Sequence, residues 1–197
     1  MTATLAVADT LAFFRAWLAD PLQAGAVLPS GPALAELITA DITPETAPVI
    51  ELGPGTGVFT RALLERGVAE HDLVLVEAGP DFARRLARRF PAARLLAMDA
   101  ARLHRLPPLK FSDGEGRLAG AVVSGLPMLS MSPRKMYAIL GGAFRHLRQD
   151  GAFYQFTYGP RCPVPGAVLD RLDLRAQRIG GVFVNLPPAS VYRLSRR

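Results

Sequence analysis

The stretch from residue 49 to residue 60, Val-Ile-Glu-Leu-Gly-Pro-Gly-Thr-Gly-Val-Phe-Thr, limits what this 197-residue chain can fold into more than any other. A short apolar run contains the acidic residue Glu51 and leads into glycines at every second position, Gly53, Gly55 and Gly57. A helical pattern follows, so the stretch predicts a strand, a tight turn and a helix. Alternating glycines let the backbone turn sharply and let a ligand lie against exposed amides. The helix N-terminus adds a positive field.

Two well-known phosphate-binding loops do not match this turn. A P-loop would end in Gly-Lys-Ser/Thr, whereas this chain has Gly57-Val58-Phe59 at that place. A dinucleotide-binding fold would space its glycines as Gly-x-Gly-x-x-Gly, and here the third glycine comes after only one residue. The residues downstream therefore have to decide what the turn binds.

The composition favours anionic partners and argues against a metal site. The chain has 23 Lys and Arg residues against 17 Asp and Glu residues, a formal charge of +6, which suits nucleic acid or an acidic membrane surface. Cys162 is the only cysteine, so an intramolecular disulfide and a cysteine-rich zinc site are excluded. The three histidines show no metal-ligand spacing, and we expect no metal.

We expect a single domain over residues 1–197, located in the cytoplasm. Half of the residues are hydrophobic, and the chain is long enough for a sizeable core. It contains no run of about 20 apolar residues of the kind that spans a membrane. Its N-terminus lacks the basic start and the small-residue cleavage site of a signal peptide.

Residues 4–19 predict an amphipathic helix that precedes the main fold. Phe13, Phe14, Trp17 and Leu18 supply a bulky apolar face. Aromatic residues in such a position fit a helix that lies in the membrane interface. The alternative is a helix that packs on the domain.

The rest of the chain alternates strand-like and helix-like segments. Strands are expected at about 48–52, 73–77, 94–98, 118–123 and 152–158, with two more at about 173–185 and 190–195. The helix before the fifth strand should run from Pro133 to about Arg148 and end at Asp150-Gly151. This alternation predicts an α/β fold, a doubly wound, mostly parallel seven-stranded sheet with an edge hairpin and an N-terminal helical extension.

Polar residues follow each of the first five predicted strands. Sheets of this type bind ligands beyond the carboxyl ends of their strands. The strand ends are, in order, Gly53, Glu77, Asp99, Ser124 and Tyr158. Because five separate strands agree, the sequence predicts one ligand site at this edge.

The sequence Glu-Leu-Gly-Pro-Gly-Thr-Gly at residues 51–57 resembles the first motif of the class I S-adenosylmethionine (SAM) methyltransferases. The resemblance implies SAM as the cofactor and S-adenosylhomocysteine as its product. The residues expected at the cofactor are Glu51, Gly53, Pro54, Gly55, Thr56, Gly57, Glu77, Ala78, Asp99, Ala100 and Ser124.

Three carboxylates have expected roles in that site. Glu77 lies 20 residues after Gly57, where it can accept both ribose hydroxyls, and its charge disfavours a ribose phosphate. The alternative for Glu77 is an acid stabilised by a helix N-terminus. Asp99 with Ala100 resembles the pair that contacts adenine, or Asp99 caps a helix. Glu51 would orient the turn or reach the methionine amine through water.

Further stretches resemble the bacterial phospholipid N-methyltransferases, which methylate phosphatidylethanolamine toward phosphatidylcholine. They are Phe13-Phe14-Arg15, Gly-Ala-Val-Leu-Pro-Ser at 25–30, Val76-Glu77-Ala78, Ser-Gly-Leu-Pro at 124–127 and Asn-Leu-Pro-Pro-Ala at 185–189. The resemblance spans nearly the whole chain. It implies a membrane anchor at residues 4–19, a phospholipid membrane with anionic lipids as the partner, a peripheral place on its cytoplasmic face, and no nucleic acid.

Two alternatives remain open. An rRNA adenine N6-dimethyltransferase would carry Asn-Leu-Pro-Tyr/Phe after the fourth strand, where this chain has Gly125-Leu126-Pro127-Met128. Glycine offers no side-chain acceptor for an adenine amine, and methionine stacks less well on a base. A SAM-binding protein without catalysis is the other alternative.

The fifth strand offers a contact for a lipid headgroup. Tyr154, Phe156 and Tyr158 alternate on one face, with Tyr158 at the ligand end. Aromatic faces tolerate amines at every stage of methylation, including the quaternary cation. Tyr158 is therefore the candidate catalytic residue, as a headgroup contact, while Tyr154 and Phe156 fit core packing equally well.

Overall fold

The computed structural model describes residues 31–107, 109, 117–182 and 188–197. Its helices are α2 (Pro32–Ile38), α3 (Val58–Glu65), α4 (Pro80–Arg89), α5 (Pro133–His146) and α6 (Gly166–Arg171). Its strands are β1 (Val49–Leu52), β2 (Leu73–Glu77), β3 (Arg94–Ala97), β4 (Ala119–Ser124), β5 (Leu147–Tyr158), β6 (Leu174–Val182) and β7 (Ala189–Arg196). Short 3-10 helices are η1 (Pro44–Thr46), η2 (Glu70–Asp72), η3 (Ala100–Arg105) and η4 (Met128–Ser130). The predicted helix at residues 4–19, with Phe13, Phe14, Trp17 and Leu18, lies outside the described residues.

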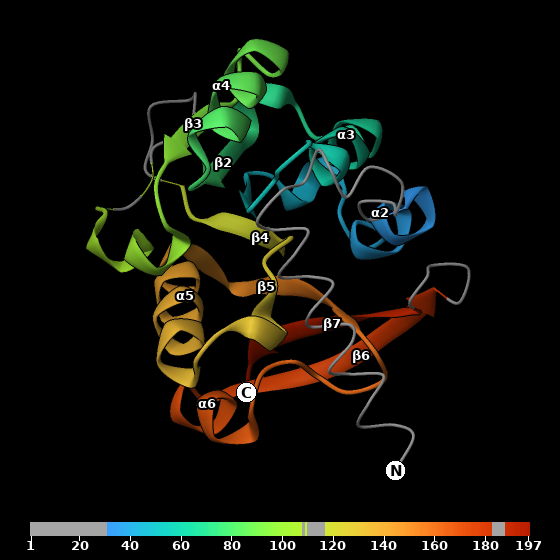
Figure 1. Cartoon of the computed structure of the whole chain (residues 1–197), viewed down its shortest axis with the longest axis vertical. Coiled ribbons are helices and arrows are strands. Elements are labelled where there is room, and N and C mark those ends of the chain that lie inside the picture. The colour runs from blue at the N-terminus through green and yellow to red at the C-terminus, as the bar shows by residue number, and fades with distance from the viewer. Residues whose placement is uncertain (1–30, 108, 110–116, 183–187) are drawn as a thin grey trace.

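The strands form one seven-stranded sheet in the order β3-β2-β1-β4-β5-β7-β6 (Figure 1). The first five strands pair in parallel, and β7 runs antiparallel to both β5 and β6. The predicted sheet and its edge hairpin are confirmed. The strand order reverses direction between β1 and β4, and α/β sheets bind their ligands beside such a switch point.

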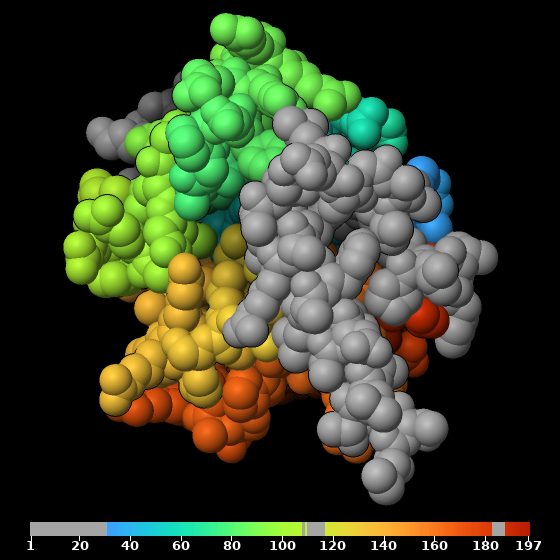
Figure 2. Space-filling model, viewed as in Figure 1, coloured from blue at the N-terminus to red at the C-terminus, as the bar shows by residue number. Residues whose placement is uncertain are grey.

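One face of the sheet is covered by α2, α3 and α4. Leu34 and Ile38 of α2, Phe59 and Leu63 of α3 and Leu86 of α4 are at most 4% exposed and pack in one hydrophobic cluster. In Figure 1, α2 and α3 lie in the upper right of the view. Figure 2 shows the surface of the same view, with α4 in its upper part and α5 and α6 in its lower part.

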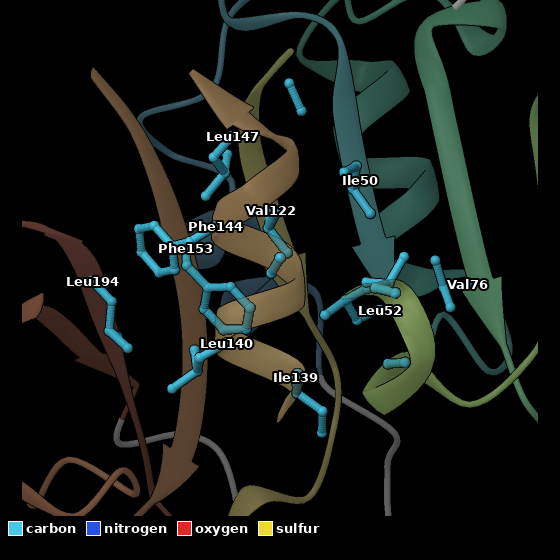
Figure 3. Packing of buried hydrophobic residues seen from close by; sticks show 14 of the residues in the cluster. Ile50, Leu52, Val76, Val122, Ile139, Leu140, Phe144, Leu147, Phe153 and Leu194 are labelled. Carbon is cyan, nitrogen blue, oxygen red and sulfur yellow. The ribbon is translucent and has the colours of Figure 1, made fainter. Parts of the chain in front are cut away.

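The other face is covered mainly by α5. Ile139, Leu140 and Phe144 of α5 pack against Val122 of β4 and Phe153 of β5 (Figure 3). Burial of each such side chain contributes roughly 1.5–3 kcal/mol. The central strands are buried on both faces, which explains the continuous apolar runs in the sequence.

The boundary between α5 and β5 differs from the prediction. The helix ends at His146, and the strand begins at Leu147, before Asp150-Gly151. The Arg196 guanidinium from β7 donates to the carbonyls of Phe144 and Leu147, at 2.6 and 3.2 Å. This contact from the end of the chain satisfies carbonyls at the helix C-terminus, so local stop signals did not predict where the helix ends. The helix α6 was also not predicted.

Candidate functional site

The glycine turn between β1 and α3 has the predicted strand–turn–helix geometry. Gly53, Gly55 and Gly57 have φ angles of 67°, 54° and 78°, which side chains rarely allow. The Gly53 N–H donates to the carbonyl of Val76 on β2 at 2.8 Å. A Cβ atom added at Gly55 would meet no described atom within 4 Å. The turn is therefore held against β2, and the described residues leave space beside Gly55 for a ligand to approach the backbone.

Glu77, at the end of β2, braces the glycine turn. Its side chain is buried, and its Oε2 accepts the Gly55 N–H at 3.0 Å while Oε1 accepts the Gly79 N–H at 2.8 Å. Sequence reasoning placed Glu77 at this edge but did not foresee the bond across to Gly55. Each carboxylate oxygen has two acceptor sites, so both oxygens keep capacity for a ligand hydroxyl.

Glu51 lies under the turn and is fully buried. Its Oε2 accepts the Thr60 hydroxyl at 2.6 Å, and its Oε1 has no hydrogen-bond partner among the described residues. Burial raises the pKa of Glu51 to about 8, helped by the charge of Glu77 and opposed by the Thr60 bond. The carboxyl group is therefore largely protonated at pH 7, and a cationic ligand nearby would favour its ionised form.

Asp99, just after β3, caps η3, which is the alternative that the sequence left open for it. Its Oδ1 accepts the Ala101 N–H at 2.9 Å, and its Oδ2 pairs with the Lys135 ammonium of α5 at 2.8 Å. Partial burial would raise the pKa of Asp99, but the bonds from Lys135 and Ala101 outweigh it and lower the pKa. Ala100 beside it is buried. Contact with adenine stays a prediction.

The loop after β4 packs directly on the glycine turn. Ser124 is buried, and its hydroxyl accepts the Leu126 N–H at 3.3 Å. A Cβ atom at Gly125 would lie 2.7 Å from the Gly53 carbonyl oxygen, so only glycine fits at residue 125. Met128 is 1% exposed and belongs to the core on the α5 face. This loop therefore has no side chain at residue 125, and Met128 lies in the core rather than at the carboxyl ends of the strands.

Tyr158 ends β5 on the same face as α2 and α3. Its ring meets Phe156 edge-on at 5.5 Å, and Phe156 meets Phe59 of α3 in the same way at 5.9 Å. Burial raises the pKa of Tyr158. The sheet order puts three strand spacings of about 4.8 Å between β2 and β5, or roughly 14 Å. Tyr158 and Glu77 would therefore contact different parts of a ligand.

Gln155 of β5 was missed by the sequence reasoning. It is fully buried, and its Nε2 donates to the Leu126 carbonyl at 3.0 Å and to the Phe156 carbonyl at 2.7 Å. The available signal was an amide in an otherwise mostly apolar and aromatic run, Ala-Phe-Tyr-Gln-Phe-Thr-Tyr at 152–158. A buried amide of this kind needs a partner or a function.

The part of the chain that the structure describes contains neither a transmembrane helix nor a metal-binding cluster. No helix there is long and apolar enough to cross a membrane. No three His, Cys, Asp or Glu side chains come together there as metal ligands would.

Comparisons with known proteins agree with this architecture. No family model matches the chain. A crystal structure of a TehB-like SAM-dependent methyltransferase from Corynebacterium glutamicum aligns with a TM-score of 0.60 over 96% of this chain and 97% of that one, at 20% identity. At this identity the likeness concerns the fold alone, and that fold is the one of the class I SAM-dependent methyltransferases.

A relative places the chain more narrowly. The ornithine lipid N-methyltransferase of Singulisphaera acidiphila is 33% identical over 172 residues, which cover 83% of this chain and 84% of that protein. The chain is a methyltransferase and belongs to the same family as that protein. The ribosomal RNA small subunit methyltransferase A of a Synechococcus strain is 38% identical over 99 residues, but these cover only 49% of this chain and 32% of that protein.

Proposed function

We propose that this protein transfers the methyl group of SAM to the amine of a membrane lipid headgroup. Phosphatidylethanolamine and its monomethyl and dimethyl forms are the proposed substrates, with phosphatidylcholine as the final product. The family relationship supports a lipid amine in general. It also favours ornithine lipid as a second candidate substrate, because the relative is named for that lipid, which carries a primary amine as well.

The observation that carries the proposal is the loop after β4. An adenine N6-methyltransferase needs a side-chain acceptor for the base amine and an aromatic ring to stack on the base. Here residue 125 has no room for a side chain, and Met128 is buried in the core. A small aliphatic amine needs neither contact, so the loop suits a lipid headgroup better than a nucleic-acid base.

The residues proposed for SAM are those of the glycine turn and the neighbouring strand ends. Gly53, Pro54, Gly55, Thr56 and Gly57 would let the cofactor lie close to the backbone of the turn, within the N-terminal field of α3. The carboxylates and small residues proposed beside them are Glu51, Glu77, Ala78, Asp99, Ala100 and Ser124. When bound, SAM supplies an electrophilic methyl group on a sulfonium.

The reaction requires a neutral amine. An ammonium with a pKa near 10.4 costs roughly 4–5 kcal/mol to deprotonate at pH 7, and removal of water from the headgroup lowers that pKa. The nitrogen lone pair then forms the new N–C bond while the C–S bond breaks. The electron pair of the C–S bond stays on sulfur, which leaves S-adenosylhomocysteine as the product. The alkylated ammonium loses a proton to solvent before another round. Tyr158 is proposed to contact the headgroup, on its aromatic face.

The proposed partner is a phospholipid surface that contains anionic lipids, rather than nucleic acid. Residues 4–19 would hold the protein on the cytoplasmic face of the membrane as a peripheral protein. The formal charge of +6 supports attraction to such a surface.

Methyl transfer from labelled SAM tests the proposal. The purified chain is incubated with vesicles of phosphatidylethanolamine and anionic phospholipid, vesicles that contain ornithine lipid, vesicles of phosphatidylcholine alone, and ribosomal RNA. We expect label in the first or second set and none in phosphatidylcholine, whose quaternary nitrogen has no lone pair. Label in RNA alone would overturn the proposal, and binding of SAM without any transfer would favour a protein without catalysis.

A further inference from the structure

Two polar atoms on β5 are buried without a hydrogen-bond partner among the described residues. They are Oε1 of Gln155 and Oγ1 of Thr157, on side chains that are 0% and 3% exposed. The two residues are two positions apart on one strand, so they share a face. This face is the one covered by α5. Phe153 lies two positions before Gln155, so it points to the same face, and it packs against α5. Unpaired buried polar atoms are costly, and native proteins keep few of them without a reason.

The orientation of the Gln155 amide is decided by its neighbours. Its Nε2 lies between the carbonyl oxygens of Leu126 and Phe156, at 3.0 and 2.7 Å, and can donate one N–H to each. The opposite orientation would turn the amide oxygen toward two other oxygens. The amide nitrogen is therefore fully used by the loop, and Oε1 is the atom left to accept a hydrogen bond.

Gln155 lies beside the loop after β4 and is linked through that loop to the glycine turn. Gln155 pairs in register with Ser124, the last residue of β4. The Leu126 carbonyl that Gln155 holds belongs to the loop after β4, and the Leu126 side chain covers Gly53, where an added Cβ would lie 2.8 Å from its Cδ2. A single residue thus connects Gln155 with the glycine turn, at the edge where sheets of this kind bind ligands.

We propose that Gln155 Oε1 and Thr157 Oγ1 accept the N–H groups of the neutral lipid amine and aim its lone pair at the methyl group. This inference rests on the proposed function. A primary amine has two N–H groups and one lone pair, so two acceptors can hold it and leave the lone pair free. The amide oxygen only accepts, which suits an amine and not a phosphate.

According to the proposal, the two acceptor atoms contribute less to the rate of each successive methyl transfer. A primary amine has two N–H groups, a monomethyl amine has one, and a dimethyl amine has none. Loss of an acceptor should therefore slow the first transfer and leave the third unchanged. A residue that acts only on stability would affect all three transfers alike.

The test compares Thr157→Val and Gln155→Met with the unaltered protein. Thr157→Val keeps the shape of the side chain and touches none of the Gln155 bonds. We expect kcat/KM for phosphatidylethanolamine to fall roughly 3- to 10-fold in each variant. In Thr157→Val, kcat/KM for the dimethyl lipid and SAM affinity should be unchanged. In Gln155→Met, which also releases the Leu126 and Phe156 carbonyls, the loss on the dimethyl lipid should be smaller than the loss on phosphatidylethanolamine. Thr157→Val should also keep or raise Tm, since it removes an unpaired hydroxyl.

Thr39→Val is the matched control, because Thr39 is equally buried but its hydroxyl donates to the Ala35 carbonyl at 2.8 Å. It should lower Tm and leave kcat/KM unchanged. The inference is overturned if both β5 variants match the unaltered protein on phosphatidylethanolamine, or lose as much activity on the dimethyl lipid. An unaltered protein that methylates no lipid amine would instead overturn the proposed function, and this inference with it.

Discussion

At the scale of single residues, two carboxylates beside the same turn have different hydrogen-bond partners. Glu77 accepts a backbone N–H group on each of its two oxygens. Glu51 has one hydroxyl donor and an oxygen with no partner among the described residues, and its burial favours the neutral form. The positions of the acids in the sequence do not reveal these surroundings, because they arise from contacts between β1, β2 and α3.

Glu77→Ala should weaken SAM binding about 10- to 100-fold, as expected when bonds worth about 1.5–3 kcal/mol to a charged group are lost. The variant removes the proposed ribose contact and releases the Gly55 and Gly79 amides. Titration calorimetry with SAM measures the change. Glu70→Ala is the control, since Glu70 also accepts a backbone N–H, from Ala92 at 2.7 Å, but precedes β2 at the opposite end. Equal affinity in both variants would contradict the role of Glu77.

The titration of Glu51 predicts how stability depends on pH. Its pKa is about 8 in the folded protein and 4.5 as a reference for the unfolded chain. Between these values the folded state holds a proton that the unfolded state releases, so stability falls as pH rises from about 4.5 to 8. Glu51→Gln removes this titration. Its Tm should therefore fall less than that of the unaltered protein over the same pH range in thermal melts, and parallel curves would refute the assignment.

At the scale of elements, the site depends on how closely two loops approach each other. The turn after β1 and the loop after β4 come from neighbouring parallel strands, and the Gly125 N–H donates to the Leu52 carbonyl at 2.8 Å. The close approach leaves no room for a Cβ atom at residue 125, which explains the glycine in the Ser-Gly-Leu-Pro stretch. The proposed choice of an aliphatic amine over a base follows from the same close approach.

Gly125→Ala should separate these two loops, because the new Cβ would lie 2.7 Å from the Gly53 carbonyl oxygen. We expect a loss of about 1–3 kcal/mol in the free energy of unfolding, typical of overpacking, and weaker SAM binding. Denaturant titration and calorimetry measure the two effects. Gly166→Ala is the control, since a Cβ there meets no described atom within 4 Å, and it should be neutral or stabilising. A Gly125→Ala protein with unaltered stability would contradict the contact.

At the scale of the whole molecule, the sheet order brings distant parts of the chain to one edge. The strands β2, β1, β4 and β5 are neighbours although they span residues 49–158, so Glu77, Gly53, Ser124 and Gln155 meet at a single rim. A residue near the C-terminus also contacts the middle of the chain, because Arg196 of β7 donates hydrogen bonds to the carbonyls at the end of α5. The proposed membrane contact belongs to this scale as well, since it would depend on residues that precede the described ones.

Removal of residues 1–19 should abolish sedimentation with anionic vesicles and leave SAM affinity unchanged. The reason is that the proposed cofactor residues all lie at or after Glu51, whereas the proposed interfacial helix lies before them. A full-length variant with Phe13, Phe14, Trp17 and Leu18 changed to alanine tests the apolar face alone and should behave in the same way. Retained sedimentation of both proteins would contradict the membrane role.

The amino-acid sequence by itself determined the architecture, and it placed the polar residues of the candidate site at one edge of the sheet. Glycine spacing, apolar runs and helical periodicity are local properties, and they predicted the parallel strands, the edge hairpin and the polar strand ends correctly. Only the tertiary structure decided where α5 ends, that Asp99 pairs with Lys135, and that Gln155 holds the loop after β4. These features join residues that are 29 to 52 positions apart. The free energy of such contacts depends on packing and burial that no local pattern encodes.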